Sequence, residues 1–160
     1  MPSCTFFGHR DCPDSLKPRL LRVLRELILQ QGVDVFYVGN QGQFDAQARS
    51  VLRELEKEFP HIRYAVVLAY LPGSRDEDCS DTMFPEGLET VHPRYAIARR
   101  NEWMLRHSDY VVTWITHPWG GAARYAEVAR RKGKQVIPLC SGLGMSNSDL
   151  SGCGLHKGPL

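Results

Sequence analysis

Two hydrophobic patterns alternate along the chain. Nearly continuous apolar runs rich in β-branched and aromatic residues, typical of buried parallel strands, occur at residues 4–7, 35–38, 62–70, 110–115 and 135–139. Between these runs, apolar residues recur at helical spacing over residues 15–31, 44–59, 94–107 and 121–132. Alternation of this kind predicts repeated βα units. The expected fold class is therefore α/β, with a mostly parallel five-stranded sheet and helices on both faces.

Two stretches do not follow this alternation. Residues 71–93 contain prolines, glycines and an acidic cluster. This stretch is longer than the roughly 12–15 residues that are the usual upper limit for loops in compact domains. A loop of this length is typical of a lid or a binding loop. Residues 141–160 contain five glycines and four serines with almost no apolar periodicity. The prediction is one domain over residues 1–140, followed by a flexible Gly/Ser-rich tail over 141–160.

The composition excludes several classes of protein. A chain of 160 residues has the length of one domain, and 42% hydrophobic with 24% charged residues is typical of a globular protein rather than a disordered one. The longest apolar run, residues 64–71, has eight residues, whereas a bilayer span needs roughly 20. The first residues lack the features of a secretory signal. We therefore expect no membrane span and a cytoplasmic location.

Charge and cysteine content also narrow the choice of partners. The formal charge of +2 comes from 20 basic and 18 acidic residues, which is too balanced to indicate a dedicated nucleic-acid-binding protein. Nucleic acid is therefore not an expected partner. The five cysteines are irregularly spaced and form no C-x-x-C pair, which favours reduced thiols over a disulfide framework or a zinc site.

Three loops that follow predicted strands carry the candidate ligand-binding residues. The carboxyl ends of parallel strands meet at one edge of a sheet, where helix N-termini favour anions. Glycine brings backbone N–H groups close to a ligand, although any single glycine pair is more typical of a tight turn. Three such loops at one edge favour a phosphate or carboxylate site. The candidates in these loops are Gly8, His9, Arg10, Gly39, Asn40, Gln41, Gly42, Asp45, Thr116, His117, Trp119, Gly120 and Gly121.

Charged residues near these loops suggest how a ligand is held. Arg10 and Arg100 are the favoured anion-binding cations, because a guanidinium grips phosphate oxygens with a planar fork of donors. Arg99 and Arg100 point about 100° apart on a helix, so only one of them faces the crevice. Glu127, two turns into the last helix, either binds ribose hydroxyls, acts as a general acid or base, or faces solvent. Asp45 either takes part in the site or compensates the dipole of its helix.

Aromatic residues occur in the same loops. Trp119 either stacks on a nucleobase or covers the core. His9 and His117, at the ends of neighbouring strands, are interpreted as hydrogen-bonding residues, because no third side chain has metal-ligand spacing. No metal and no cofactor are predicted.

Longer motifs resemble a known family. Residues 100–110, the strand after them and the run PWGGAARYAE at 118–127 resemble the SLOG superfamily, which includes LOG-type phosphoribohydrolases, the DNA-processing protein A group and many small bacterial and phage proteins. Residues 5–10 and 39–45 are most similar to those small proteins. The similarity spans residues 4–139. It implies a Rossmann-like three-layer sandwich that binds a nucleotide or a nucleotide-derived ligand.

The resemblance also implies roles for single residues. LOG-type enzymes have an arginine four residues before a methionine, then a strand and P-G-G-x-G-T-x-x-E, and the arginine and a glutamate are implicated in cleaving an N-glycosidic bond. Arg100 with Met104 matches the first part, and Glu127 matches the glutamate. The chain departs from the pattern at Ala123 and Arg124, where the family has glycine and threonine.

These features lead to three expected functions. The leading one is binding, and hence sensing, of a nucleotide or nucleotide-derived small molecule in a crevice at the carboxyl edge of the sheet. The alternative is an N-glycosidic hydrolase acting on nucleoside monophosphates, with Arg100 and Glu127 as catalytic residues. The second alternative is a DNA-associated protein. By resemblance to LOG-type enzymes, a homodimer is the leading expectation for its assembly.

Overall fold

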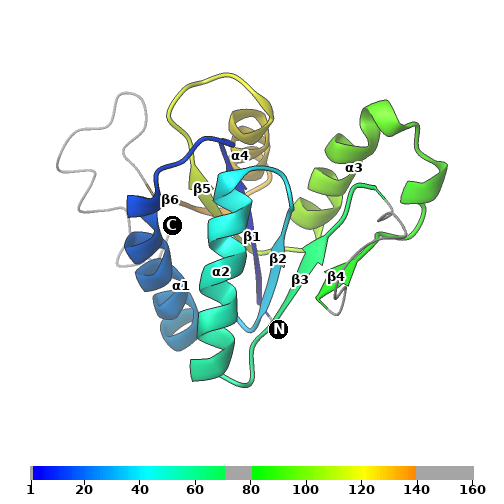
Figure 1. Ribbon diagram of the computed structural model, residues 1–160. Coiled ribbons are helices and arrows are strands. Elements are labelled where there is room, and N and C mark those ends of the chain that lie inside the picture. The colour runs from blue at the N-terminus through cyan, green and yellow to red at the C-terminus, as the bar shows by residue number, and fades with distance from the viewer. Residues whose placement is uncertain (1, 71–80, 140–160) are drawn as a thin grey trace.

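A sheet of six parallel strands lies at the centre of the part of the chain that the structure describes (Figure 1). The structure is a computed structural model that describes residues 2–70 and 81–139. The strand order is β4-β3-β2-β1-β5-β6, and every neighbouring pair is parallel. The strands are β1 (Ser3–Gly8), β2 (Val35–Val38), β3 (Arg63–Val67), β4 (Thr82–Met83), β5 (Tyr110–Trp114) and β6 (Gln135–Pro138). The predicted α/β class is confirmed.

Helices cover both faces of this sheet (Figure 1). Helices α1 (Lys17–Gln31) and α2 (Gln43–Glu58) pack on one face, and α3 (Pro93–Arg106) and α4 (Gly121–Arg131) pack on the other. Successive residues of a strand point to opposite faces, so Phe6 lies in the core beneath α1 and α2 whereas Phe7 lies in the core beneath α3 and α4. Short 3-10 helices occupy Asp14–Leu16 and Leu88–Thr90.

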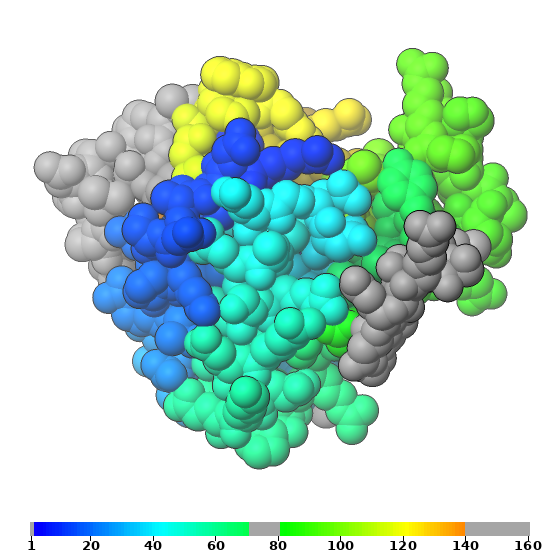
Figure 2. Space-filling view, viewed as in Figure 1, coloured from blue at the N-terminus to red at the C-terminus, as the bar shows by residue number. Residues whose placement is uncertain are grey.

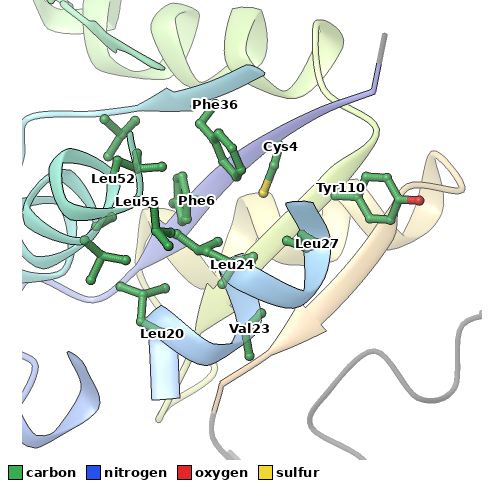
Figure 3. Packing of buried hydrophobic residues seen from close by; sticks show 14 of the residues in the cluster. Cys4, Phe6, Leu20, Val23, Leu24, Leu27, Phe36, Leu52, Leu55 and Tyr110 are labelled. Carbon is green, nitrogen blue, oxygen red and sulfur yellow. The ribbon is translucent and has the colours of Figure 1, made fainter. Parts of the chain in front are cut away.

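The larger core lies between β1, β2 and the first two helices (Figure 3). Leu20, Leu24 and Leu27 form the buried stripe of α1, as their helical spacing predicts, and each is fully buried. They pack in one cluster with the rings of Phe6 and Phe36, which stack at 6.4 Å between centroids. This packing holds α1 and α2 side by side on the sheet and fixes where the loops at its carboxyl edge begin.

The sheet has one strand more than the five that the sequence predicts. Strand β4 lies within residues 71–93, where a loop was expected, and it pairs with β3 through Val66 and Val67. Two residues are too few to produce a periodic signal. Asp81, just before β4, anchors this edge by accepting hydrogen bonds from Arg49 at 2.9–3.2 Å. Residues 71–80 of the expected long loop and the expected tail at 141–160 lie outside the described residues.

The path of the chain through the sheet reverses at one point. From β1 the chain adds β2, β3 and β4 in one direction, and α3 then returns it to β5 on the other side of β1. Such a reversal leaves a crevice beyond the carboxyl ends of the two strands that flank it, here β1 and β5. Ligands of open α/β sheets bind in that crevice.

Candidate functional site

A cavity of about 590 Å³ opens at the point where the strand order reverses. Its wall combines the end of β1, the start of α2, one face of α3 and the segment that leads into α4. Figure 2 shows the segment after β1 (blue), the start of α2 (cyan) and the segment before α4 (yellow) together at the top of the molecule. The predicted site residues in the cavity wall are Gly8, His9, Arg10, Gln41, Asp45, Arg100, Thr116, His117, Gly120 and Gly121.

Three predicted residues of the β2–α2 loop do not line the cavity but contact residues that do. Gly39 leaves no room for a side chain, because a Cβ atom there would lie 2.8 Å from Asp45 Oδ2 and 2.9 Å from Arg100 Nη1. Gly42 has φ +94° and lies so close to Arg10 that an added Cβ would be 2.7 Å from its Cα atom. Asn40 Oδ1 accepts a hydrogen bond from Arg100 Nη1 at 3.3 Å. These residues therefore position wall residues instead of lining the cavity.

Two other predicted residues do not line the cavity. Trp119 is 67% exposed and is not among the cavity's lining residues. Glu127, predicted as a candidate catalytic residue, is also absent from the lining. Its carboxylate faces solvent and pairs at 3.5 Å with Arg130 and Arg131 one turn further along α4. The solvent-facing alternative is therefore the one that describes Glu127.

Arg100 supplies a buried cation to the cavity. Only 3% of it is exposed, and its guanidinium donates through Nε to Asn101 Oδ1 at 3.1 Å and through Nη1 to Asn40. Burial lowers the pKa of Arg100, and the neighbouring Asp45 opposes that change. Arg99 instead points to solvent, 3.6 Å from Glu102. Of the two adjacent arginines, Arg100 is thus the one that faces the crevice.

Asp45 places a carboxylate beside this arginine. It lies in the first turn of α2, is 8% exposed, and accepts a hydrogen bond through Oδ2 from the Gln41 backbone N–H at 2.8 Å. Burial raises the pKa of Asp45 to about 6, although the Gln41 N–H, Arg100 and Arg10 all favour the charged form. Asp45 is thus a buried carboxyl in the cavity wall with a raised pKa, a combination that is common at functional sites.

Replacing Asp45 with asparagine is expected to remove a pH dependence of stability. With a folded pKa of about 6 and an unfolded pKa of about 4, Asp45 binds more protons in the folded chain between these pH values. The free energy of unfolding therefore falls as the pH rises from about 4 to about 6, by about 1–3 kcal/mol from this group. Urea denaturation at pH 4–7 should show that the gap between the wild type and Asp45→Asn changes by this amount. Parallel stability curves for the two proteins would contradict it.

Three aromatic rings form a stack at the cavity rim, which we call the ring column: His9, His117 and Trp119. The His9 and His117 rings are 3.6 Å apart at 17°, and the His117 and Trp119 rings are 4.0 Å apart at 20°. The His117 backbone N–H donates to His9 Nε2 at 3.4 Å. Burial, and then the charge of His117, lower the pKa of His9. His117 thus contacts both His9 and Trp119. The described residues contain no group of three histidine, cysteine, aspartate or glutamate side chains able to hold a metal ion.

The start of α4 borders the cavity. Gly120, with φ +96°, precedes the helix, and no side chain caps its first turn. Gly121 and Ala122, the first residues of α4, line the cavity. Free N–H groups and the helix dipole at such an end favour an anion.

Sequence reasoning missed part of one wall. Ile97, Asn101 and Met104 line the cavity together with Arg100. Their spacing of three, four and seven residues from Ile97 puts all four on one face of α3, next to one another. This helical spacing could have identified the three residues from the sequence, because it places them on the same face of the helix as Arg100.

Two solved structures of DNA processing protein A share this fold. The structure from Streptococcus pneumoniae matches with a TM-score of 0.64 at 14% identity, over 86% of this chain and 50% of that protein. The structure from Helicobacter pylori, described for its single-stranded DNA binding mode, matches with a TM-score of 0.56 at 16% identity, over 96% of this chain and 74% of that protein. The chain thus spans half the length of the S. pneumoniae protein. The Rossmann-like fold that the SLOG resemblance implies is confirmed.

Comparisons by sequence found no related protein. No family model matches the chain, and no curated protein matches its sequence. Among the described residues, no helix is long and apolar enough to cross a membrane.

Proposed function

We propose that the cavity binds a nucleotide or a nucleotide-derived ligand. The observation that carries the proposal is the buried guanidinium of Arg100 in the wall of a cavity of about 590 Å³ beyond the ends of β1 and β5. This volume is within the usual range for small-molecule sites, about 300–1,000 Å³. A buried cation of this kind is costly unless its charge is compensated, and a ligand phosphate would add to the compensation that the nearby Asp45 provides.

Different groups in the cavity wall suit different parts of such a ligand. Arg100, Arg10 and the uncapped start of α4 favour the phosphate, because all three present N–H donors and positive charge. Asp45 repels a phosphate but accepts hydrogen bonds from sugar hydroxyls, as acidic residues do in other nucleotide sites. The proposed pose therefore has the sugar at Asp45 and the phosphate toward Arg100 and Gly121.

Calorimetric titration tests this proposal. The probes are the four common 5′-monophosphates, AMP, GMP, CMP and UMP, with the matching nucleosides as controls. At least one monophosphate is expected to bind, and the matching nucleoside should bind at least about tenfold more weakly, because it lacks the charge-assisted contact. Equal binding of the two would contradict a phosphate site, and absence of binding by all of them would overturn the proposal.

Single-stranded DNA is a second candidate ligand. The likeness in fold to the H. pylori protein, whose structure concerns single-stranded DNA binding, favours it. The net charge of +2 argued against nucleic acid, but a local site needs few phosphate contacts, and its affinity does not depend on bulk charge alone. Fluorescence anisotropy with a labelled 12-nucleotide strand tests this candidate, and weakening with salt would report phosphate contacts.

Hydrolysis of an N-glycosidic bond through Glu127 is not part of the proposal. A general acid or base must come within hydrogen-bond reach of the bond it acts on. Glu127 pairs with Arg130 and Arg131 and does not line the cavity. The homodimer expected from the resemblance stays a prediction.

A further inference from the structure

The ring column continues from the cavity wall to the protein surface. His9 and His117 line the cavity, whereas Trp119 does not. His117 lies between the other two rings, so both of its faces are covered. Trp119 has one face against His117 and is 67% exposed, so its other face is open. The outermost surface of the column is therefore a bare indole face beside the mouth of the cavity.

The column holds this indole in one orientation before any ligand arrives. The near-parallel stack with His117 orients the Trp119 ring, and the His9 ring supports His117 from behind. Burial and the neighbouring His117 lower the pKa of His9, so the charged form that would oppose the stacking of the two imidazoles is disfavoured. A preorganised ring loses little conformational entropy when a second flat group stacks on it.

The position of Trp119 outside the wall determines which part of a ligand can reach it. The cavity volume of about 590 Å³ is large enough for a whole mononucleotide, so base, sugar and phosphate can all lie within it. A group that stacks on Trp119 is then additional to the nucleotide in the cavity. Stacking on an aromatic face is tolerant of base identity, because every nucleobase has a flat π surface.

We propose that Trp119 is a second base-stacking subsite, so that the ligand carries two nucleobases joined through phosphate. This inference rests on the proposed nucleotide site in the cavity. The first nucleotide lies in the cavity, and the linking phosphate passes the ring column so that the second base stacks on the indole. A free dinucleotide and the end of a single strand share this chemistry.

Binding of one-base and two-base probes tests the inference. The probes are AMP and 5′-phosphorylated diadenylate, with the GMP, CMP or UMP pair used instead if AMP is not the monophosphate that binds best. The wild type is expected to bind the dinucleotide about tenfold more tightly than the mononucleotide. Trp119→Ala should abolish this preference while the affinity for the mononucleotide stays within about twofold. Trp119→Phe, which keeps a ring, should retain most of the preference.

Control measurements separate the possible outcomes. Leu29→Ala is the matched control, because Leu29 is a similarly exposed apolar residue, 64% exposed, on α1. Equal affinity of the wild type for both probes, or an equal loss for both in Trp119→Ala, overturns the second subsite and leaves the proposed function intact. Binding of neither probe overturns both. If a 12-nucleotide strand binds no better than the dinucleotide, the natural ligand is a free dinucleotide. If the strand binds more tightly, the natural ligand is a single-stranded nucleic acid.

Discussion

Arg100→Ala is expected to weaken the binding of a 5′-mononucleotide by about 1.5–3 kcal/mol, or roughly 10- to 150-fold. The loss follows from the position of the guanidinium, which is 3% exposed in the cavity wall and already held by Asn40 and Asn101. A cation fixed in this way loses little conformational freedom when it binds a phosphate. Calorimetric titration of the two proteins with the same monophosphate measures the effect.

The neighbouring arginine provides the matched control. Arg99 carries the same charge one residue earlier on α3, but its side chain is 61% exposed and pairs only loosely, at 3.6 Å, with Glu102. Arg99→Ala should therefore change the affinity by less than about twofold, since exposed ion pairs contribute little. Urea denaturation must accompany the titration, because loss of the buried cation leaves the Asp45 carboxylate less compensated. A folded Arg100→Ala protein with wild-type affinity would remove Arg100 from the site.

The parts of the fold that could be predicted are those in which a hydrophobic pattern is repeated over several residues of the sequence. The buried stripe of α1 contains Leu20, Leu24 and Leu27 at regular spacing, and these three leucines are fully buried. Parallel strands such as β1 and β5 are buried on both faces, which makes them continuous apolar runs. Strand β4 has two residues, and pairing with β3 alone defines it. Its existence depends on tertiary contacts that no local pattern carries.

The candidate site was predictable to the extent that topology alone determines it. Because the carboxyl ends of parallel strands meet at one edge, segments far apart in sequence, such as those that contain His9, Asp45 and His117, had to come together. Spacing could not tell whether Glu127 faces the cavity, because its environment depends on how α4 is rotated against the sheet. The Trp119 stack was equally inaccessible, since it requires the relative orientation of rings from two different loops.

Gly8→Ala is expected to lower the free energy of unfolding by about 1–3 kcal/mol through overpacking. Gly8 ends β1 directly over the Phe44 ring, and a Cβ atom there would lie 2.8 Å from Phe44 Cε2 and closer still to Cγ and Cδ2. Phe44 is fully buried and packs edge-on against Phe6 at 6.4 Å, so it has no space into which to move. For a domain of this size, thermal denaturation should register a fall of about 2–4 °C for each kcal/mol.

Gly8→Ala should also lower the affinity for the mononucleotide, because Phe44 is followed directly by Asp45 in the first turn of α2. If the Phe44 ring is displaced from β1, the first turn of α2 and the Asp45 carboxylate in it are displaced as well. The free energy of unfolding and the ligand affinity should therefore fall together. Gly121→Ala controls for the stability effect, since a Cβ atom there meets nothing within 4 Å and the melting temperature should stay close to that of the wild type. Combining Gly8→Ala with Phe44→Leu, which shortens the obstructing side chain, should cost less than the sum of the two single changes. Additive losses would instead mean that the Gly8 methyl group and the Phe44 ring do not compete for the same space.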